Sequence, residues 1–266
     1  MVGTMTTMPD FDDVLSALHG SSSDLARIAD KLDGNAIRQP SYASEWSIAQ
    51  VYSHMGSGAE IGLATVQVAL GEGPPPDNEA IWDRWNEYSP EQMVSESVAA
   101  DQRYVAFAAA VPPATRESLR VNSYLGPIDL ATWLTLRLHE HALHAWDIRV
   151  ALDPTATLRA DAVPILLDGP LLMIGGAMAR GDKPASGRLG IDVSDPERHL
   201  LLSIDDGVEL SAAEADGADS TSRLVISGEA LLRLTAGRLD SDHTPDSVRS
   251  EGTLTLDDLR RLFPGY

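Results

Sequence analysis

The segment Leu138-His-Glu-His-Ala-Leu-His-Ala-Trp-Asp147 holds three of the seven histidines of a chain of 266 residues. It lies inside a pattern of helical period that begins at about Asp129 and ends before Pro154. One long helix therefore carries an unusual density of ionisable and metal-ligating side chains. What this helix packs against is indicated by the segments that precede it.

Three further segments of helical period come earlier in the chain, each closed by a break rich in Pro or Gly. Ser47 and Ser89 are typical helix starts, and Pro90 after the second of them fits the first helical turn. Four helices of about 20 residues with short breaks predict a four-helix bundle. The three earlier helices are expected at 11–32, with a soft point at 20–23, at 47–70 and at 89–110.

The sequence after Pro154 has a different hydrophobic pattern. Residues 161–180 predict one more, strongly apolar helix, after which the hydrophobic period changes to two. The predicted fold class is therefore α+β, with a helical bundle over residues 1–157 followed by a smaller α/β domain over residues 158–266. Short strands are expected at 188–193, 199–205, 208–212 and 223–227, and helices at 229–236 and 256–263.

Composition excludes several classes of protein. Hydrophobic residues make up 43% of the chain, yet no apolar run approaches the roughly 20 residues that span a bilayer, so no membrane protein is expected. The 40 acidic and 20 basic residues give a net charge of −20, which repels nucleic acid. The acidic start is unlike a secretory signal, and the absence of cysteine excludes disulfides and a cysteine nucleophile. A cytoplasmic protein is expected.

A helical wheel sorts the histidine-rich segment. At about 100° per residue, Glu140 and His144 share one face with Arg137 and Asp147. His139 and His141 lie about 100° from Glu140 on opposite sides, and the residue four after His139 is Leu143, so the zincin motif His-Glu-x-x-His is absent.

A polar face turned into an apolar bundle core needs compensation, and a bound metal would supply it. Glu140 and His144 would be two ligands, and His54, the only histidine of the second helix, would be the third. Two imidazoles and one carboxylate leave an open position, which is typical of catalytic zinc. The alternative is an ordinary i,i+4 contact between Glu140 and His144 with a hydrogen-bonded His54. The remaining histidines, at 19, 199 and 243, are interpreted as surface residues.

These residues also carry a resemblance. Trp46-Ser-Ile-Ala-Gln-Val-x-x-His54, with Arg137-x-x-Glu140-x-x-x-His144-x-Trp-Asp147, resembles the DinB-like metal-binding superfamily. More narrowly, it resembles the mycothiol-dependent maleylpyruvate isomerase family of actinobacteria. Residues 224–239 resemble the second, α/β domain of that family, which is similar to sterol-carrier-like folds.

The resemblance implies a divalent metal, usually zinc, held by His54, Glu140 and His144, and mycothiol as a thiol cosubstrate. It implies an S-transferase or cis-trans isomerase in which the metal-activated thiol attacks a small electrophile. It also implies that an arginine of the second domain reaches the active site, and Arg238 is the candidate. The alternative for Arg238 is a helix C-terminal arginine that balances the helix dipole.

Two other functions stay open. One is a DinB-like thiol-exchange enzyme of a biosynthetic pathway that uses another thiol. The other is a non-catalytic protein that binds a small ligand. In each case the expected partners are small molecules, with no nucleic acid and no membrane, and the chain is expected to be a monomer or a homodimer.

Overall fold

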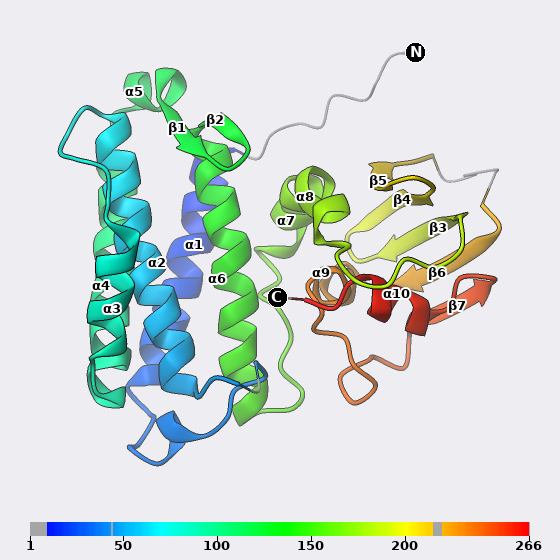
Figure 1. The fold of residues 1–266 in the computed structure, drawn as a ribbon, viewed down its shortest axis with the longest axis horizontal. Helices are drawn as coiled ribbons and strands as arrows, with labels where there is room; N and C mark the ends of the chain where they lie inside the picture. Colours follow the sequence, from blue (N-terminus) through cyan, green and yellow to red (C-terminus); the bar gives the residue numbers. More distant parts are fainter. Residues whose placement is uncertain (1–9, 44, 215–219, 266) are drawn as a thin grey trace. The chain divides into compact units, whose positions relative to one another are not determined.

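The computed structural model describes residues 10–43, 45–214 and 220–265. These residues form two compact units, divided in the sequence between Thr157 and Leu158 (Figure 1). The first unit is helical and the second contains a sheet, so the α+β class predicted from the sequence is confirmed.

Four long helices make up the body of the first unit (Figure 1). They are α1 (Phe11–Ala29), α2 (Ile48–Ala69), α4 (Pro90–Ala110) and α6 (Leu130–Leu152). The short elements between them are the 3₁₀ helix η1 (Ala36–Arg38), helices α3 (Asn78–Asn86) and α5 (Pro113–Ser118), and a hairpin of β1 (Arg120–Ser123) and β2 (Gly126–Asp129).

Local sequence explains where the long helices begin. Ser47 and Ser89 each form a capping box with the glutamine three residues later, which satisfies backbone groups at the starts of α2 and α4. Asp129 accepts a hydrogen bond from the backbone of Thr132 and so caps α6. The α1 helix continues through the expected soft point because Ser21 and Ser22 are buried in the bundle.

The second unit has a five-stranded sheet in the order β5-β4-β3-β6-β7. The central strands β3 and β6 are parallel, and the other neighbours are antiparallel. Buried residues alternate along β3 at Leu189, Ile191 and Val193, so the helices cover one face of the sheet (Figure 1). The strands are β3 (Gly187–Ser194), β4 (Glu197–Ile204), β5 (Val208–Ala212), β6 (Ser222–Ile226) and β7 (Arg249–Gly252), and the helices are α7 (Val163–Asp168), α8 (Pro170–Met178), α9 (Gly228–Thr235) and α10 (Leu256–Leu262).

The single helix predicted over residues 161–180 is wrong. The chain breaks between α7 and α8 at Gly169, whose backbone angles are φ −113° and ψ −95°. Pro170 follows and has no backbone N–H to continue the first helix, so it begins the second one. Strand β7 was not predicted from the sequence. All four of its residues are exposed, so they show no alternation of apolar and polar side chains.

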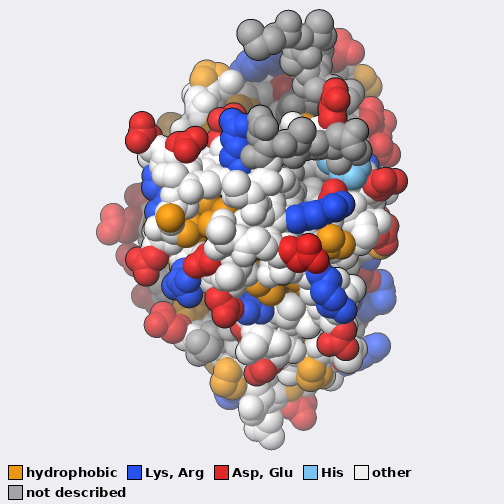
Figure 2. All heavy atoms as spheres, turned by 90° about the vertical axis from the view of Figure 1, so that its right-hand side faces the viewer, with side chains coloured by type: hydrophobic (Ala, Val, Ile, Leu, Met, Phe, Trp, Pro, Cys, Tyr) orange, Lys and Arg blue, Asp and Glu red, His pale blue; other side chains and the backbone are white. Residues whose placement is uncertain are grey.

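None of the helices in the described ranges is both long and apolar enough to cross a membrane. On the face of the molecule in Figure 2, acidic side chains are scattered and basic ones lie between them. That face, as far as its residues are described, has no broad basic patch of the kind that binds nucleic acid.

Candidate metal centre

Helices α2 and α6 bring the three predicted ligands together. One donor atom each of His54, Glu140 and His144 lies within 4.8 Å of the others. Glu140 Oε2 is 3.8 Å from Nε2 of His54 and 3.7 Å from Nε2 of His144. Both imidazoles therefore direct the same ring nitrogen toward one carboxylate oxygen.

Trp46, which precedes the start of α2, packs beside these imidazoles. Its ring centroid is 5.1 Å from that of His54 and 6.2 Å from that of His144, and it is stacked on the latter. The two imidazoles meet edge to face at 4.7 Å. The aromatic contacts restrict both rings, and they depend on the cap at Ser47 that places Trp46 just outside the helix.

Asp147 sets the orientation of His144. Its Oδ2 lies 2.9 Å from Nδ1 of His144, and the Asp147 side chain is completely buried. An ionised carboxylate only accepts, so Nδ1 carries the proton and Nε2 presents its lone pair. A carboxylate behind a histidine in this way is the usual support for a metal-ligating imidazole.

The electrostatic surroundings keep Glu140 ionised. Burial by itself raises the pKa of Glu140, but the neighbouring imidazoles of His54, His144 and His139 outweigh it and lower the pKa to about 2. The carboxylate is therefore in the form that binds a cation at neutral pH. Two imidazole nitrogens and one carboxylate oxygen are a donor set that fits zinc and leaves a coordination position for another molecule.

Arg137 and His141 belong to a buried network rather than to this centre. Nη2 of Arg137 donates to Oδ1 of Asp101 on α4 at 2.9 Å. The other Asp101 oxygen is hydrogen bonded to Nε2 of His141, whose Nδ1 is 2.8 Å from the Ser21 hydroxyl on α1. Burial raises the pKa of Asp101, and His141 and Arg137 outweigh it, so the pKa is lowered. The network links three helices.

Sequence reasoning missed Asp101. Its signal was a single acidic residue in the Ala- and Val-rich part of α4, which is costly to bury without a partner. The histidines split as the wheel indicated, since His141 faces the network and His144 the candidate metal centre. His139 is also buried, with 2% of its surface exposed.

Arg238 belongs to the second unit, three residues after the end of α9, and only 6% of it is exposed. Its Nη1 donates to the carbonyl of Ala236 at 2.8 Å, the contact expected of an arginine at a helix C-terminus. The preceding Gly237 has φ +71°, and a side chain there would collide with Gly265.

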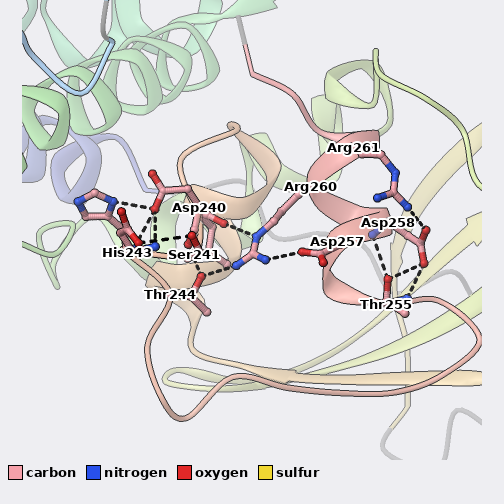
Figure 3. A network of polar contacts seen from close by, with 11 residues as sticks. Asp240, Ser241, His243, Thr244, Thr255, Asp257, Asp258, Arg260 and Arg261 are labelled. Atoms are coloured by element: carbon pink, nitrogen blue, oxygen red, sulfur yellow. Dashed lines mark hydrogen bonds and ion pairs between the residues drawn. The ribbon is translucent and has the colours of Figure 1, made fainter.

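The loop after Arg238 is tied to α10 (Figure 3). Arg260 donates to the carbonyl of Leu239 at 2.7 Å, to Asp257 and to the Thr244 hydroxyl, each of the last two at 2.6 Å. Asp240 accepts from the backbone and ring of His243. His243 is thus part of a loop network, and the backbone around Arg238 is held on both sides.

Comparisons with known proteins identify a family model and two solved structures that are similar to this chain. The model of the mycothiol maleylpyruvate isomerase N-terminal domain matches residues 18–149. The crystal structure of the mycothiol-dependent maleylpyruvate isomerase has a similar fold, with a TM-score of 0.66 and 17% identity, over 93% of this chain and 95% of that one. A mutant of that isomerase, with a histidine replaced by alanine, gives a TM-score of 0.65 over the same shares, also at 17% identity. No curated protein matches the chain in sequence.

Proposed function

Because residues 18–149 match the model of the mycothiol maleylpyruvate isomerase N-terminal domain, we propose that this chain is a metal-dependent enzyme of that family and uses mycothiol as a thiol cosubstrate. The observation that carries the proposal is the convergence of His54, Glu140 and His144. Zinc is the metal we propose for them. When bound, it would lower the pKa of a thiol and so supply a thiolate at neutral pH.

The side chains around the centre favour binding of a divalent metal. Asp147 keeps the proton of His144 on Nδ1, so that Nε2 is available as a ligand. Glu140 stays ionised and contributes the negative charge that holds a divalent cation. The chain has no cysteine, so the nucleophilic sulfur has to arrive on a cosubstrate.

The reaction we propose is addition of the thiol to a small conjugated electrophile. The sulfur forms a bond to one alkene carbon, and the electron pair of the double bond moves onto the conjugated carbonyl oxygen. In an isomerase the resulting single bond rotates, and the sulfur leaves with its electron pair as the alkene reforms. In an S-transferase a proton is added instead and the sulfur stays attached.

We further propose that residues 158–266 are the second domain of the same family, and that Arg238 neutralises negative charge on the electrophile. A guanidinium can bind two carboxylate or enolate oxygens at once. The proposed reaction takes place in the cytoplasm.

The proposal is tested by metal analysis of the purified protein together with a panel of low-molecular-weight thiols and an activated alkene. We expect about one zinc per chain and thiol-dependent loss of the alkene, fastest with mycothiol. Metal binding with faster turnover of a different thiol would favour a thiol-exchange enzyme. Equal alkene loss in thiol-free buffer would contradict the proposal.

A further inference from the structure

Arg137 is a buried cation next to the candidate metal centre, and the proposed function leaves it without a role. It lies one turn before Glu140 on α6, and 10% of its side chain is exposed. Its Nη2 donates both to Asp101 Oδ1 at 2.9 Å and to the Met55 carbonyl at 2.7 Å. Because the guanidinium is planar, these two anchors fix the direction of its other nitrogens.

Those other nitrogens have no hydrogen-bond acceptor among the described residues. Nε is buried without a partner. Nη1 lies against α2 at Gly58, where a Cβ atom would come within 2.8 Å of it. Gly58 is one turn after His54, as Arg137 is one turn before Glu140. The unpaired edge of the guanidinium therefore lies one helical turn from the candidate metal centre.

Two more buried polar groups lie near it, Tyr104 on α4 and Trp133 on α6. Their side chains interact with each other, whereas Arg137 Nε is buried without a partner in the described ranges. The Tyr104 ring is 6.0 Å from the Arg137 guanidinium carbon, and Trp133 lies one turn before Arg137 on α6. Guanidinium nitrogens are seldom left unpaired when they are buried, so the unpaired edge of Arg137 indicates that an acceptor binds there.

We propose that Arg137 binds a carboxylate of the small electrophile, an inference that rests on the proposed function. Guanidinium nitrogens can only donate, so the site suits an oxyanion and not a cation or a neutral donor. Gly58, which Nη1 approaches, is one turn from His54 on α2, so a carboxylate held at Nη1 lies about one helical turn, roughly 5 Å along the helix, from the candidate metal centre. The site therefore selects unsaturated acids over their esters.

The test uses the full-length, zinc-loaded chain and maleate as the probe, titrated by calorimetry, with dimethyl maleate as the neutral control. Gly58→Ala places a methyl group 2.8 Å from Nη1, which is too close for an ordinary contact, so it displaces the unpaired edge of the guanidinium while the positive charge is retained. Gly62→Ala is the matched control, because its methyl group, one turn further along α2, meets the Tyr104 ring at 3.1 Å instead. A third protein, Arg137→Met with Asp101→Asn, removes both buried charges together and so avoids an unpaired one.

We expect Gly58→Ala and the double variant to weaken maleate binding at least tenfold, with zinc content unchanged and with Gly62→Ala close to the parent. Binding of the diester should not depend on Arg137. Maleate affinity that is the same in the double variant, or absent in the parent at millimolar concentration, overturns the inference. Thiol addition, assayed separately, decides the proposed function, so a protein that binds maleate through Arg137 but consumes no thiol refutes only the latter.

Discussion

Nδ1 of His144 is hydrogen bonded to the buried Oδ2 of Asp147 at 2.9 Å, three residues along the same helix. The same α6 helix carries a second histidine held by a buried carboxylate, His141 with Asp101. Only the first of these histidines faces Glu140. The two histidine–carboxylate pairs can therefore be compared directly. One contains a candidate metal ligand, and the other contains a histidine of the buried network.

Asp147→Asn should lower zinc affinity by about 10- to 100-fold, because the amide holds the His144 tautomer and basicity less well. Competition with a chromogenic chelator measures the change. Asp101→Asn, the matched substitution on the other pair, should leave zinc affinity within a factor of about two. Equal losses in both variants would show that Asp147 acts only through stability.

His144→Ala should remove the metal, whereas His139→Ala should retain it. The reason is that His144 directs Nε2 at Glu140, while His139 lies about 100° from Glu140 around α6 and is not one of the three candidate ligands. Elemental analysis after gel filtration gives the metal content, and circular dichroism checks that both proteins remain helical. Parallel metal loss from the two variants would refute the assignment of faces on α6.

Glu140 should make the metal-free protein more stable above about pH 5 than at pH 2. Its pKa is lowered to about 2 in the folded chain and is near 4.5 otherwise, so its stabilising contribution is complete above 4.5 and is lost as the pH falls toward 2. Comparing the unfolding of the parent with that of Glu140→Gln across this range measures it. A difference that grows on acidification would have the wrong sign.

Asp101→Ala should destabilise the helical unit by about 3–5 kcal/mol, because it leaves Arg137 and His141 buried without their shared partner. Ser21→Ala removes one neutral hydrogen bond and should cost only about 1 kcal/mol. Denaturant unfolding followed by tryptophan fluorescence reports on this unit, since Trp46, Trp82, Trp85, Trp133 and Trp146 all lie in it. Similar small losses in both variants would mean that Asp101 is not ionised.

Arg238→Ala should lower kcat/KM by roughly a hundredfold or more while the zinc content stays the same, which is the scale for losing one positioned charge contact. Arg238→Lys should recover only part of the activity, because an ammonium cannot reproduce the guanidinium fork. Arg238 also donates to Ala236, so the unfolding midpoint of the second unit has to be measured alongside. Unchanged kinetics with a lowered midpoint would assign Arg238 a structural role.

The helices that the sequence predicted well are those with both a periodic apolar face and a side-chain cap, as at Ser47 and Ser89. Gly169-Pro170 misled the prediction because the apolar residues on both sides continue without a change of period. β7 could not be predicted, since a strand with every residue exposed pairs through its backbone alone.

The candidate site divides in a similar way. Glu140 and His144 could be placed on one face because helical geometry relates residues four apart. The partnership of Asp101 with Arg137 and His141 joins residues 36 and 40 positions apart, and the register between two helices is not encoded in either one. Whether a buried donor is paired likewise depends on how the helices pack. The helical wheel could therefore place Arg137 on a face of its helix, but it could not predict that Nε would lack a hydrogen-bond partner.

All of the candidate ligands, and the carboxylate behind His144, lie between residues 54 and 147, whereas the central strands β3 and β6 of the sheet lie beyond residue 186. A growing polypeptide folds its earlier domain first. We therefore expect the helical unit to fold, with its three candidate ligands together, while the sheet still lacks a central strand. Under the proposed function, the nascent chain can then bind its metal before the second unit has folded.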